Sequence, residues 1–160
     1  MSKKEASKFR DRVILILKDK EGNIKHMYDS DWRENTMTNA GFAEVAGLMV
    51  SDVGGTAFDY IAIGTGTTGA SASDTALETE THREAATGSR TTTSVSNDTA
   101  KWVATFSGYS GSEAVTESGV LNAGTGGTLL CRQVFSAVNV DWDAGDSLQI
   151  TWKVQVKQGS

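Results

Sequence analysis

The sequence contains no proline and a single cysteine, Cys131, among its 160 residues. One cysteine excludes an intrachain disulfide and a metal site built from several thiolates, and it is typical of a reducing compartment. Cys131 lies in an apolar, strand-like stretch, so we expect it to be buried filler. The absence of proline, together with 17 glycines, describes short strands joined by turns rather than rigid linkers.

Long apolar runs are also missing. No window approaches the roughly 18–20 apolar residues needed to span a bilayer, so a membrane partner is not expected. The basic opening is followed by only five apolar residues, 13–17, and then Lys18, which does not resemble a signal peptide. We therefore expect synthesis and retention in the cytoplasm, or in a particle assembled there.

Few residues suit catalysis or metal binding. His26 and His82 are the only histidines, and neither has a second His or Cys at ligand spacing. Two isolated histidines do not favour a catalytic triad, which needs a base between a nucleophile and an orienting acid. We therefore predict no enzyme activity and no cofactor. The acidic stretch 141–146 is interpreted as a turn, with adventitious calcium as the alternative.

Two carboxylate pairs leave one enzymatic alternative open. Glu78 with Glu80, and Glu113 with Glu117, are spaced so that either pair could flank a glycosidic bond. The sequence shows no aromatic-lined cleft around them. Polysaccharide cleavage is therefore the least favoured function.

Charge is distributed unevenly along the chain. The net charge is −5, but residues 1–12 hold five basic and two acidic side chains, +3, which leaves −8 for the remainder. An acidic body does not favour a nucleic-acid surface, because phosphate binding needs clustered Lys and Arg. Residues 1–12 are predicted to be a flexible basic arm. It is either a solvated terminus or a tether reaching roughly 40 Å to a neighbouring subunit. The candidate partner-binding residues are Lys3, Lys4, Lys8, Phe9, Arg10 and Arg12.

Hydrophobic patterning predicts a mainly β fold. Residues 13–17 and 24–28 form a hairpin whose first strand is apolar on both faces, so both faces are expected to be covered. One short helix is expected over residues 40–50, capped by Thr38 or Asn39, because Phe42, Val45, Leu48 and Met49 recur at helical spacing.

Strands and turns alternate after the helix. Residues 58–63 favour a strand that enters a loop over 64–73, and 74–84 fit either a short polar helix or ordered coil. Further strands are expected at 90–96, 101–107, 114–121, 128–135 and 147–156. Residues 13–158 are therefore predicted to form one antiparallel β-sandwich, jelly-roll-like in arrangement, behind the arm.

Two local features are given structural roles. The pattern Gly64-x-Gly66-x-x-Gly69 matches a dinucleotide-binding expression, but no apolar helix follows it, so a tight loop is the better interpretation. Glu117 lies in an otherwise apolar segment. We expect it to be partly buried and to be satisfied by backbone amides or by Arg132, and Gly119 is grouped with these structural positions.

Six segments carry a wider pattern: 38–48 (TNAGFAEVAGL), 60–68 (YIAIGTGTT), 74–80 (DTALETE) with Arg83 nearby, 115–122 (VTESGVLN), 126–135 (GGTLLCRQVF) and 148–152 (LQITW). In order and spacing they resemble a family of small structural proteins of tailed-bacteriophage virions. Residues before 35 depart from that pattern.

The resemblance implies a non-enzymatic virion protein made in the host cytoplasm. Within the family it favours a capsid decoration (cement) protein, a homotrimer bound to the major capsid protein on the outer lattice. The alternative is a tail, neck or fibre-associated adaptor that contacts a receptor.

Overall fold

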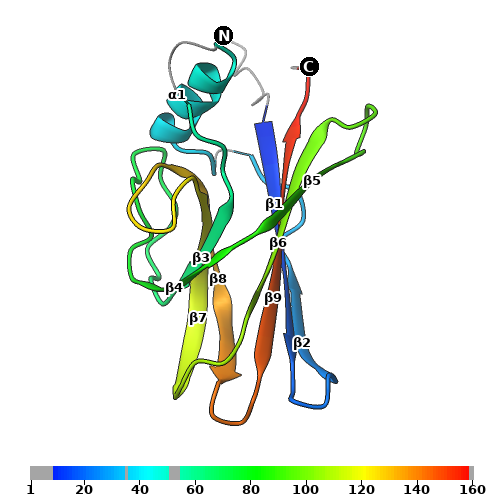
Figure 1. Cartoon of the computed structure of the whole chain (residues 1–160), viewed down its shortest axis with the longest axis vertical. Coiled ribbons are helices and arrows are strands. Elements are labelled where there is room, and N and C mark those ends of the chain that lie inside the picture. Colours follow the sequence, from blue (N-terminus) through cyan, green and yellow to red (C-terminus); the bar gives the residue numbers. More distant parts are fainter. Residues whose placement is uncertain (1–8, 35, 51–54, 159–160) are drawn as a thin grey trace, which may run out of the picture.

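The computed structural model describes residues 9–34, 36–50 and 55–158. Figure 1 shows one short helix beside two layers of strands. In chain order the elements are β1 (Phe9–Lys18), β2 (Ile24–Asp29), α1 (Asn39–Leu48), β3 (Tyr60–Gly64), β4 (Glu80–Ala85), β5 (Thr87–Thr91), β6 (Thr99–Phe106), β7 (Ser112–Leu121), β8 (Leu129–Asp141) and β9 (Ser147–Val156). Within these ranges, no helix has both the length and the apolar character needed to cross a membrane.

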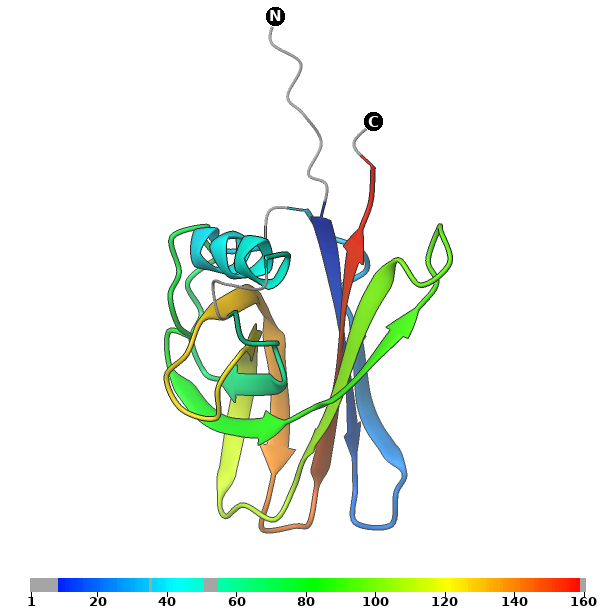
Figure 2. The same cartoon turned by 45° about the horizontal axis from the view of Figure 1, so that its top comes forward.

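The strands form two antiparallel sheets that pack face to face (Figure 2). One sheet has the order β2-β1-β9-β6-β5 and the other β4-β3-β7-β8. Only Ala86 separates β4 from β5, so the chain passes from one sheet to the other at that residue. The predicted antiparallel β-sandwich with one short helix is confirmed.

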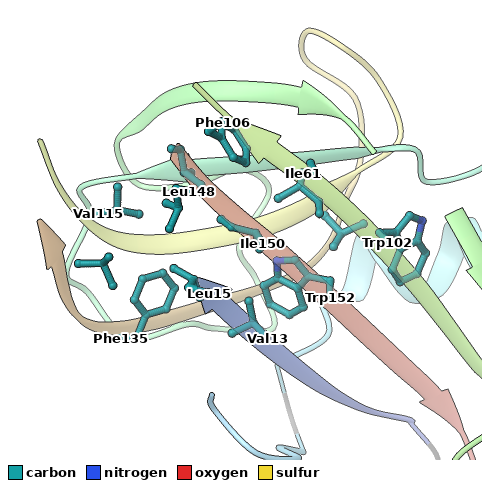
Figure 3. Close-up of a cluster of buried hydrophobic side chains, with 14 of the residues drawn as sticks. Val13, Leu15, Ile61, Trp102, Phe106, Val115, Phe135, Leu148, Ile150 and Trp152 are labelled. Atoms are coloured by element: carbon teal, nitrogen blue, oxygen red, sulfur yellow. The ribbon is translucent and has the colours of Figure 1, made fainter. Parts of the chain in front are cut away.

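The core lies between the sheets and is filled by alternate side chains from each strand. In β9, Leu148, Ile150, Trp152 and Val154 are buried, while the residues between them are partly exposed. The facing sheet contributes side chains that include Ile61, Val115 and Phe135 (Figure 3). The sequence predicted β9 with its bounds, because its period-two alternation is regular.

The N-terminal hairpin is confirmed, but its first strand is fully covered on one face only. Val13, Leu15 and Leu17 are buried, whereas Ile14 and Ile16 are only partly buried. The expectation that both faces are covered therefore holds in full for the inner face alone. The apolar residues on the second face lie on the outside of the sandwich.

The boundary of the basic arm is corrected by β1. This strand begins at Phe9, and it pairs with β9 from Phe9 opposite Val156 onward. Residues 9–12 are therefore part of the sandwich, because their backbone pairs with the last residues of β9. Residues 1–8, including Lys3, Lys4 and Lys8, lie outside the described residues.

Three other elements differ from the sequence prediction. The strand expected at 90–96 is β5, which ends at Thr91, because Asp98 organises the following residues into a turn. Residues 74–79 are coil, and β4 begins at Glu80. Strand β8 continues to Asp141, six residues beyond its expected end.

Candidate functional site

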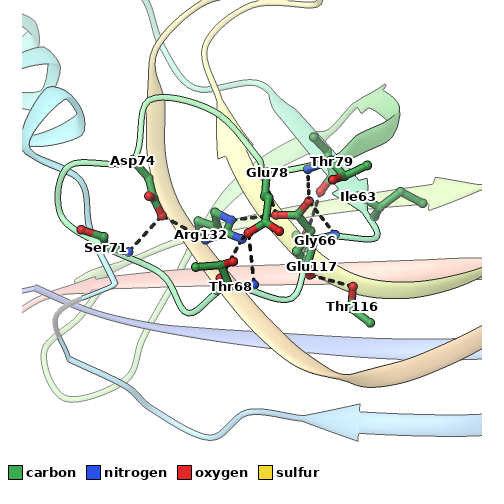
Figure 4. A network of polar contacts seen from close by, with 12 residues as sticks. Ile63, Gly66, Thr68, Ser71, Asp74, Glu78, Thr79, Thr116, Glu117 and Arg132 are labelled. Atoms are coloured by element: carbon green, nitrogen blue, oxygen red, sulfur yellow. Dashed lines mark hydrogen bonds and ion pairs between the residues drawn. The ribbon is translucent and has the colours of Figure 1, made fainter.

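The most strongly connected buried group is the carboxylate of Glu117, in the middle of β7. Its side chain is fully buried and accepts four hydrogen bonds (Figure 4). Oε1 accepts from the amides of Gly66 at 3.0 Å and Thr79 at 2.7 Å. Oε2 accepts from the amide of Glu78 at 3.0 Å and from Nε of Arg132 at 2.7 Å. The predicted contacts of Glu117 with backbone amides and with Arg132 are both confirmed.

Arg132 on β8 extends this network to the far side of the β3–β4 loop, residues 65–79. Its guanidinium donates to Oδ2 of Asp74 at 3.0 Å and to the carbonyl of Thr68 at 2.9 Å. The carboxylate of Glu78 lies 3.7 Å from the same guanidinium. The roles of Asp74 and Thr68 were not predicted, since residues in exposed polar loops give no periodic signal.

Glycine is required where this loop meets Glu117. A Cβ added to Gly66 would lie 2.6 Å from Oε1 of Glu117, and one added to Gly64 would lie 2.2 Å from the carbonyl oxygen of Thr79. Gly119, on β7, packs in the same way against Leu77 and Leu129. The glycine pattern therefore serves close approach of backbone to a carboxylate. A phosphate-binding helix does not follow it.

The network fastens a 15-residue loop to the outer face of the β4-β3-β7-β8 sheet. Beneath the loop, Leu77 packs with Ala62, Leu121 and Leu129 in a second small core. The charges are paired and hydrogen-bonded, as buried charges must be. Glu117 is wholly enclosed by its own chain, so it cannot act with Glu113 across a substrate in this conformation, which was the less favoured alternative.

Helix α1 is attached to β8 by close backbone contact. Thr38 caps the helix: its Oγ1 accepts from the amide of Gly41 at 2.8 Å, and its own amide donates to the carbonyl of Leu130 at 2.9 Å. A Cβ on Gly41 would lie 2.6 Å from that same carbonyl oxygen. The buried residues of the helix are Gly41 and Gly47. The contact with the sandwich is therefore made by the two glycines, the cap and Val45, which is partly buried against the core.

The large apolar side chains of this segment are exposed instead. Phe42 is 40% exposed, Leu48 45%, Met49 82% and Val50 48%; we call these four residues the α1 surface. The one charged side chain between positions 39 and 50, Glu44, accepts from the amide of Thr56 at 2.6 Å. The α1 surface thus consists of four exposed apolar side chains with no charged side chain among them.

The candidate partner-binding residues of the arm are partly engaged within the chain. Nε of Arg10 donates to Gln155 at 2.5 Å, and the guanidinium lies 4.7 Å from the ring centroid of Trp32. Arg12 makes a two-pronged ion pair with Asp29. Phe9 packs edge-on against Phe42, with ring centroids 5.5 Å apart. Phe9 therefore contacts the α1 surface, whereas Arg12 pairs with Asp29 of β2.

A second polar cluster lies at the opposite end of the sandwich, around the start of β7. His82 stacks on Tyr109 with centroids 3.7 Å apart, and its Nε2 lies 3.1 Å from Oε1 of Glu113. The same oxygen accepts from the indole of Trp142 at 3.0 Å. Tyr109 donates to Glu84, and burial, followed by that carboxylate, raises the pKa of the Tyr109 hydroxyl. These contacts close the end of the core.

The acidic stretch 141–146 forms the β8–β9 turn. Asp146 accepts from the amide of Asp141 at 3.0 Å and pairs with Lys25 at 2.6 Å. Across the ranges that the structure describes, no group of three or more His, Cys, Asp or Glu side chains is arranged to hold a metal ion.

Comparisons with protein-family models, with curated proteins and with solved structures give no match to this chain.

Proposed function

We propose that this chain is a non-enzymatic structural protein of a tailed-phage virion, and specifically a capsid decoration protein. It would bind the major capsid protein on the outer lattice as a homotrimer. The observation that carries the proposal is the α1 surface, four exposed apolar side chains on an element that is hydrogen-bonded to the sandwich. The resemblance of six sequence segments to phage virion proteins supports the choice of assembly.

The α1 surface has the chemistry of an interface centre. The centre of a protein interface is depleted of charge and enriched in Met and aromatic side chains, with polar groups at its rim. Met49 and Phe42 provide those side chains. The nearby carboxylate of Glu44 accepts a hydrogen bond from the amide of Thr56 within the chain. A patch of this kind on a soluble protein marks a contact surface.

Rigidity supports the same function. The Glu117–Arg132 network fixes the β3–β4 loop, and the Thr38 cap with Gly41 fixes α1, so little conformational entropy is lost when these elements meet a partner. A decoration protein acts by mass action: it binds the expanded lattice, and a trimer that engages several capsid subunits at once stabilises that state.

The decisive test is cryo-electron microscopy of particles that carry this protein. The proposal predicts density at threefold or quasi-threefold positions of the lattice, with α1 directed at the major capsid protein. Density confined to the tail or its vertex would overturn the decoration role in favour of a tail or neck adaptor. A parallel assay of purified protein on capsular polysaccharide is expected to show no cleavage.

A further inference from the structure

The segment between the hairpin and α1 closes the side of the sandwich where β1 faces β8. It makes two isolated bridges, one from Arg33 to Asp11 of β1 and one from Met37 to Cys131 of β8. In the first, the two amides donate to the two carbonyls at 2.9 and 2.8 Å. We call the described residues of this segment, 33, 34, 36 and 37, the crossover. It leads directly into Thr38, the cap of α1.

A carboxyl group is buried under this crossover. Asp11 is fully inaccessible to solvent, and its Oδ1 accepts from Nε2 of Gln133 at 2.7 Å. Its Oδ2 accepts from Oγ1 of Thr36, a crossover residue. One side chain therefore touches three separate elements: its own strand β1, the crossover and β8.

Among the residues that the structure describes, no cation forms an ion pair with Asp11. The groups that face it are Gln133 and the Cys131 thiol from β8, with Thr36 and, more distantly, Arg33 from the crossover. Its partner on β9 is Val154. On its own strand, Arg10 and Arg12 are occupied by Gln155 and Asp29. An ionised Asp11 is thus stabilised by two hydrogen bonds and a distant charge. These interactions do not offset the cost of burying a carboxylate.

The cluster also has one hydrogen-bond acceptor too many. Oε1 of Gln133 is buried without a partner, and among the described residues it is the one buried side-chain N or O atom in that state. Each such atom costs free energy, because its water is lost and not replaced. A proton added at Asp11 would give the cluster one more donor.

We propose that Asp11 is a protonation-controlled clasp, whose neutral form fastens the crossover between β1 and β8 and whose ionisation loosens it. On acidification a proton passes from solvent to the carboxylate, and the free-energy cost of burying a charge at this position is removed. The crossover continues into Thr38, whose own bonds to β8 and Gly41 hold α1, so the clasp acts on the segment that precedes the cap. This inference does not depend on the virion function.

The pKa of Asp11 agrees with this arrangement. Burial raises it to about 6, and the hydrogen bonds from Thr36 and Gln133 lower it only in part. The pKa of an aspartate in the unfolded chain is about 3.9, so between pH 4 and 6 the folded state binds the extra proton. The contribution of Asp11 to the free energy of unfolding is therefore fully present below about pH 4 and is lost as the pH rises through about 6.

The test begins with the wild-type chain. The carboxyl carbon of Asp11 is followed by NMR through a pH titration, and a midpoint near 6 is expected. Protection of the Asp11 and Arg33 amides against hydrogen exchange, corrected for intrinsic rates, should be greater at pH 5 than at pH 7.5, by up to about a hundredfold. A midpoint below 4.5, or equal protection at the two pH values, would overturn the clasp.

Two variants separate the clasp from general acid effects. Asp11→Asn carries a permanent amide donor at this position, so it should be more stable than wild type at pH 7.5 and lose the pH dependence between 4 and 6. Asp146→Asn is the matched control: burial opposes ionisation there, but Lys25 and the Asp141 amide more than offset it and lower the pKa of Asp146. That variant should be less stable at neutral pH. An Asp11→Asn protein that keeps the wild-type pH profile would contradict the proposal, and the NMR midpoint decides the matter if this variant does not fold.

Discussion

The backbone amide of Gly66 donates to Oε1 of Glu117 at 3.0 Å, although 51 positions separate the two residues. A hydrogen bond of this kind makes a surface loop depend on a buried charge in another strand. The carboxylate organises the loop, and Arg132 neutralises the carboxylate. The loop, the charge pair and the two glycines therefore form one cooperative unit, and changes to its members should not be additive.

Removing either member of the buried pair should be costly. Glu117→Ala leaves Arg132 buried without its main partner, and Arg132→Met leaves the buried Glu117 with its three backbone amides but without a counter-charge. We expect each to lower the free energy of unfolding by about 3–5 kcal/mol. Urea denaturation of both variants and of the double variant measures this, and the double variant should lose much less than the sum. Additive losses would mean that the pair is not coupled.

An exposed pair gives the control for charge removal itself. Lys157 and Glu34 are 2.6 Å apart at the surface. Lys157→Ala should change stability by less than about 1 kcal/mol, because water screens an exposed pair.

Gly66→Ala should destabilise the protein, because its Cβ would lie 2.6 Å from the Glu117 carboxylate. The expected loss is about 1–3 kcal/mol, typical of overpacking at a site that cannot expand freely. Gly69→Ala is the matched control in the same loop, since a Cβ there has no neighbour within 4 Å. Thermal unfolding should separate the two variants, and equal melting temperatures would contradict the close-approach role of Gly66.

Asp98 should make the protein sensitive to acid. Burial acts to raise its pKa, but the amides of Val95, Thr93 and Ser94 and the side chain of Gln155 together hold the pKa well below its usual range. The folded state thus favours the ionised form, so this stability is present above about pH 4 and is lost as the pH falls. Asp98→Asn should lower the melting temperature at pH 7, and the difference from wild type should shrink towards pH 2. A difference that stays constant with pH would rule out ionisation as the cause.

The α1 surface should be needed for binding and dispensable for folding. Met49→Ser removes the most exposed of its apolar side chains, so stability should be almost unchanged while affinity for the particle falls at least tenfold, about 1.4 kcal/mol. Val95→Ser is the control, because Val95 is 70% exposed in the β5–β6 turn, away from α1. Co-sedimentation with particles measures both. Equal losses for the two variants would assign binding to general surface hydrophobicity.

Sequence patterns predicted those parts of the fold in which one face of an element is buried. Strand β9 alternates regularly, and its bounds were predicted correctly. The helix was also predicted, but for an incomplete reason. Apolar residues at helical spacing usually indicate the buried face. In α1 the fully buried residues are Gly41 and Gly47, and of the four apolar residues only Val45 packs on the core, while Phe42, Leu48 and Met49 are exposed. Composition cannot distinguish an apolar face that packs on a core from one that is left for a partner.

The candidate site was predicted where a charge interrupts an apolar strand. Glu117 was found in this way, and Arg132 was the nearest counter-charge on a neighbouring strand. Asp11 was missed, because it precedes the apolar run of β1 among basic residues and was assigned to the arm. A carboxyl group at a core position, without a cation beside it, contradicts the usual pattern of burial. The observed position of the crossover was needed to show it.

The place of β9 in the sheet also determines when the sandwich can form during synthesis. This strand lies between β1 and β6. During synthesis β1 therefore leaves the ribosome first, and the strand with which it pairs follows about 140 residues later. Until then, the inner face of the β1–β2 hairpin has no sheet to join, and its apolar residues are available to chaperones or to other nascent chains. Pairing between such distant segments is slow. The sheet must therefore close after residues 147–156 leave the ribosome, in one late step.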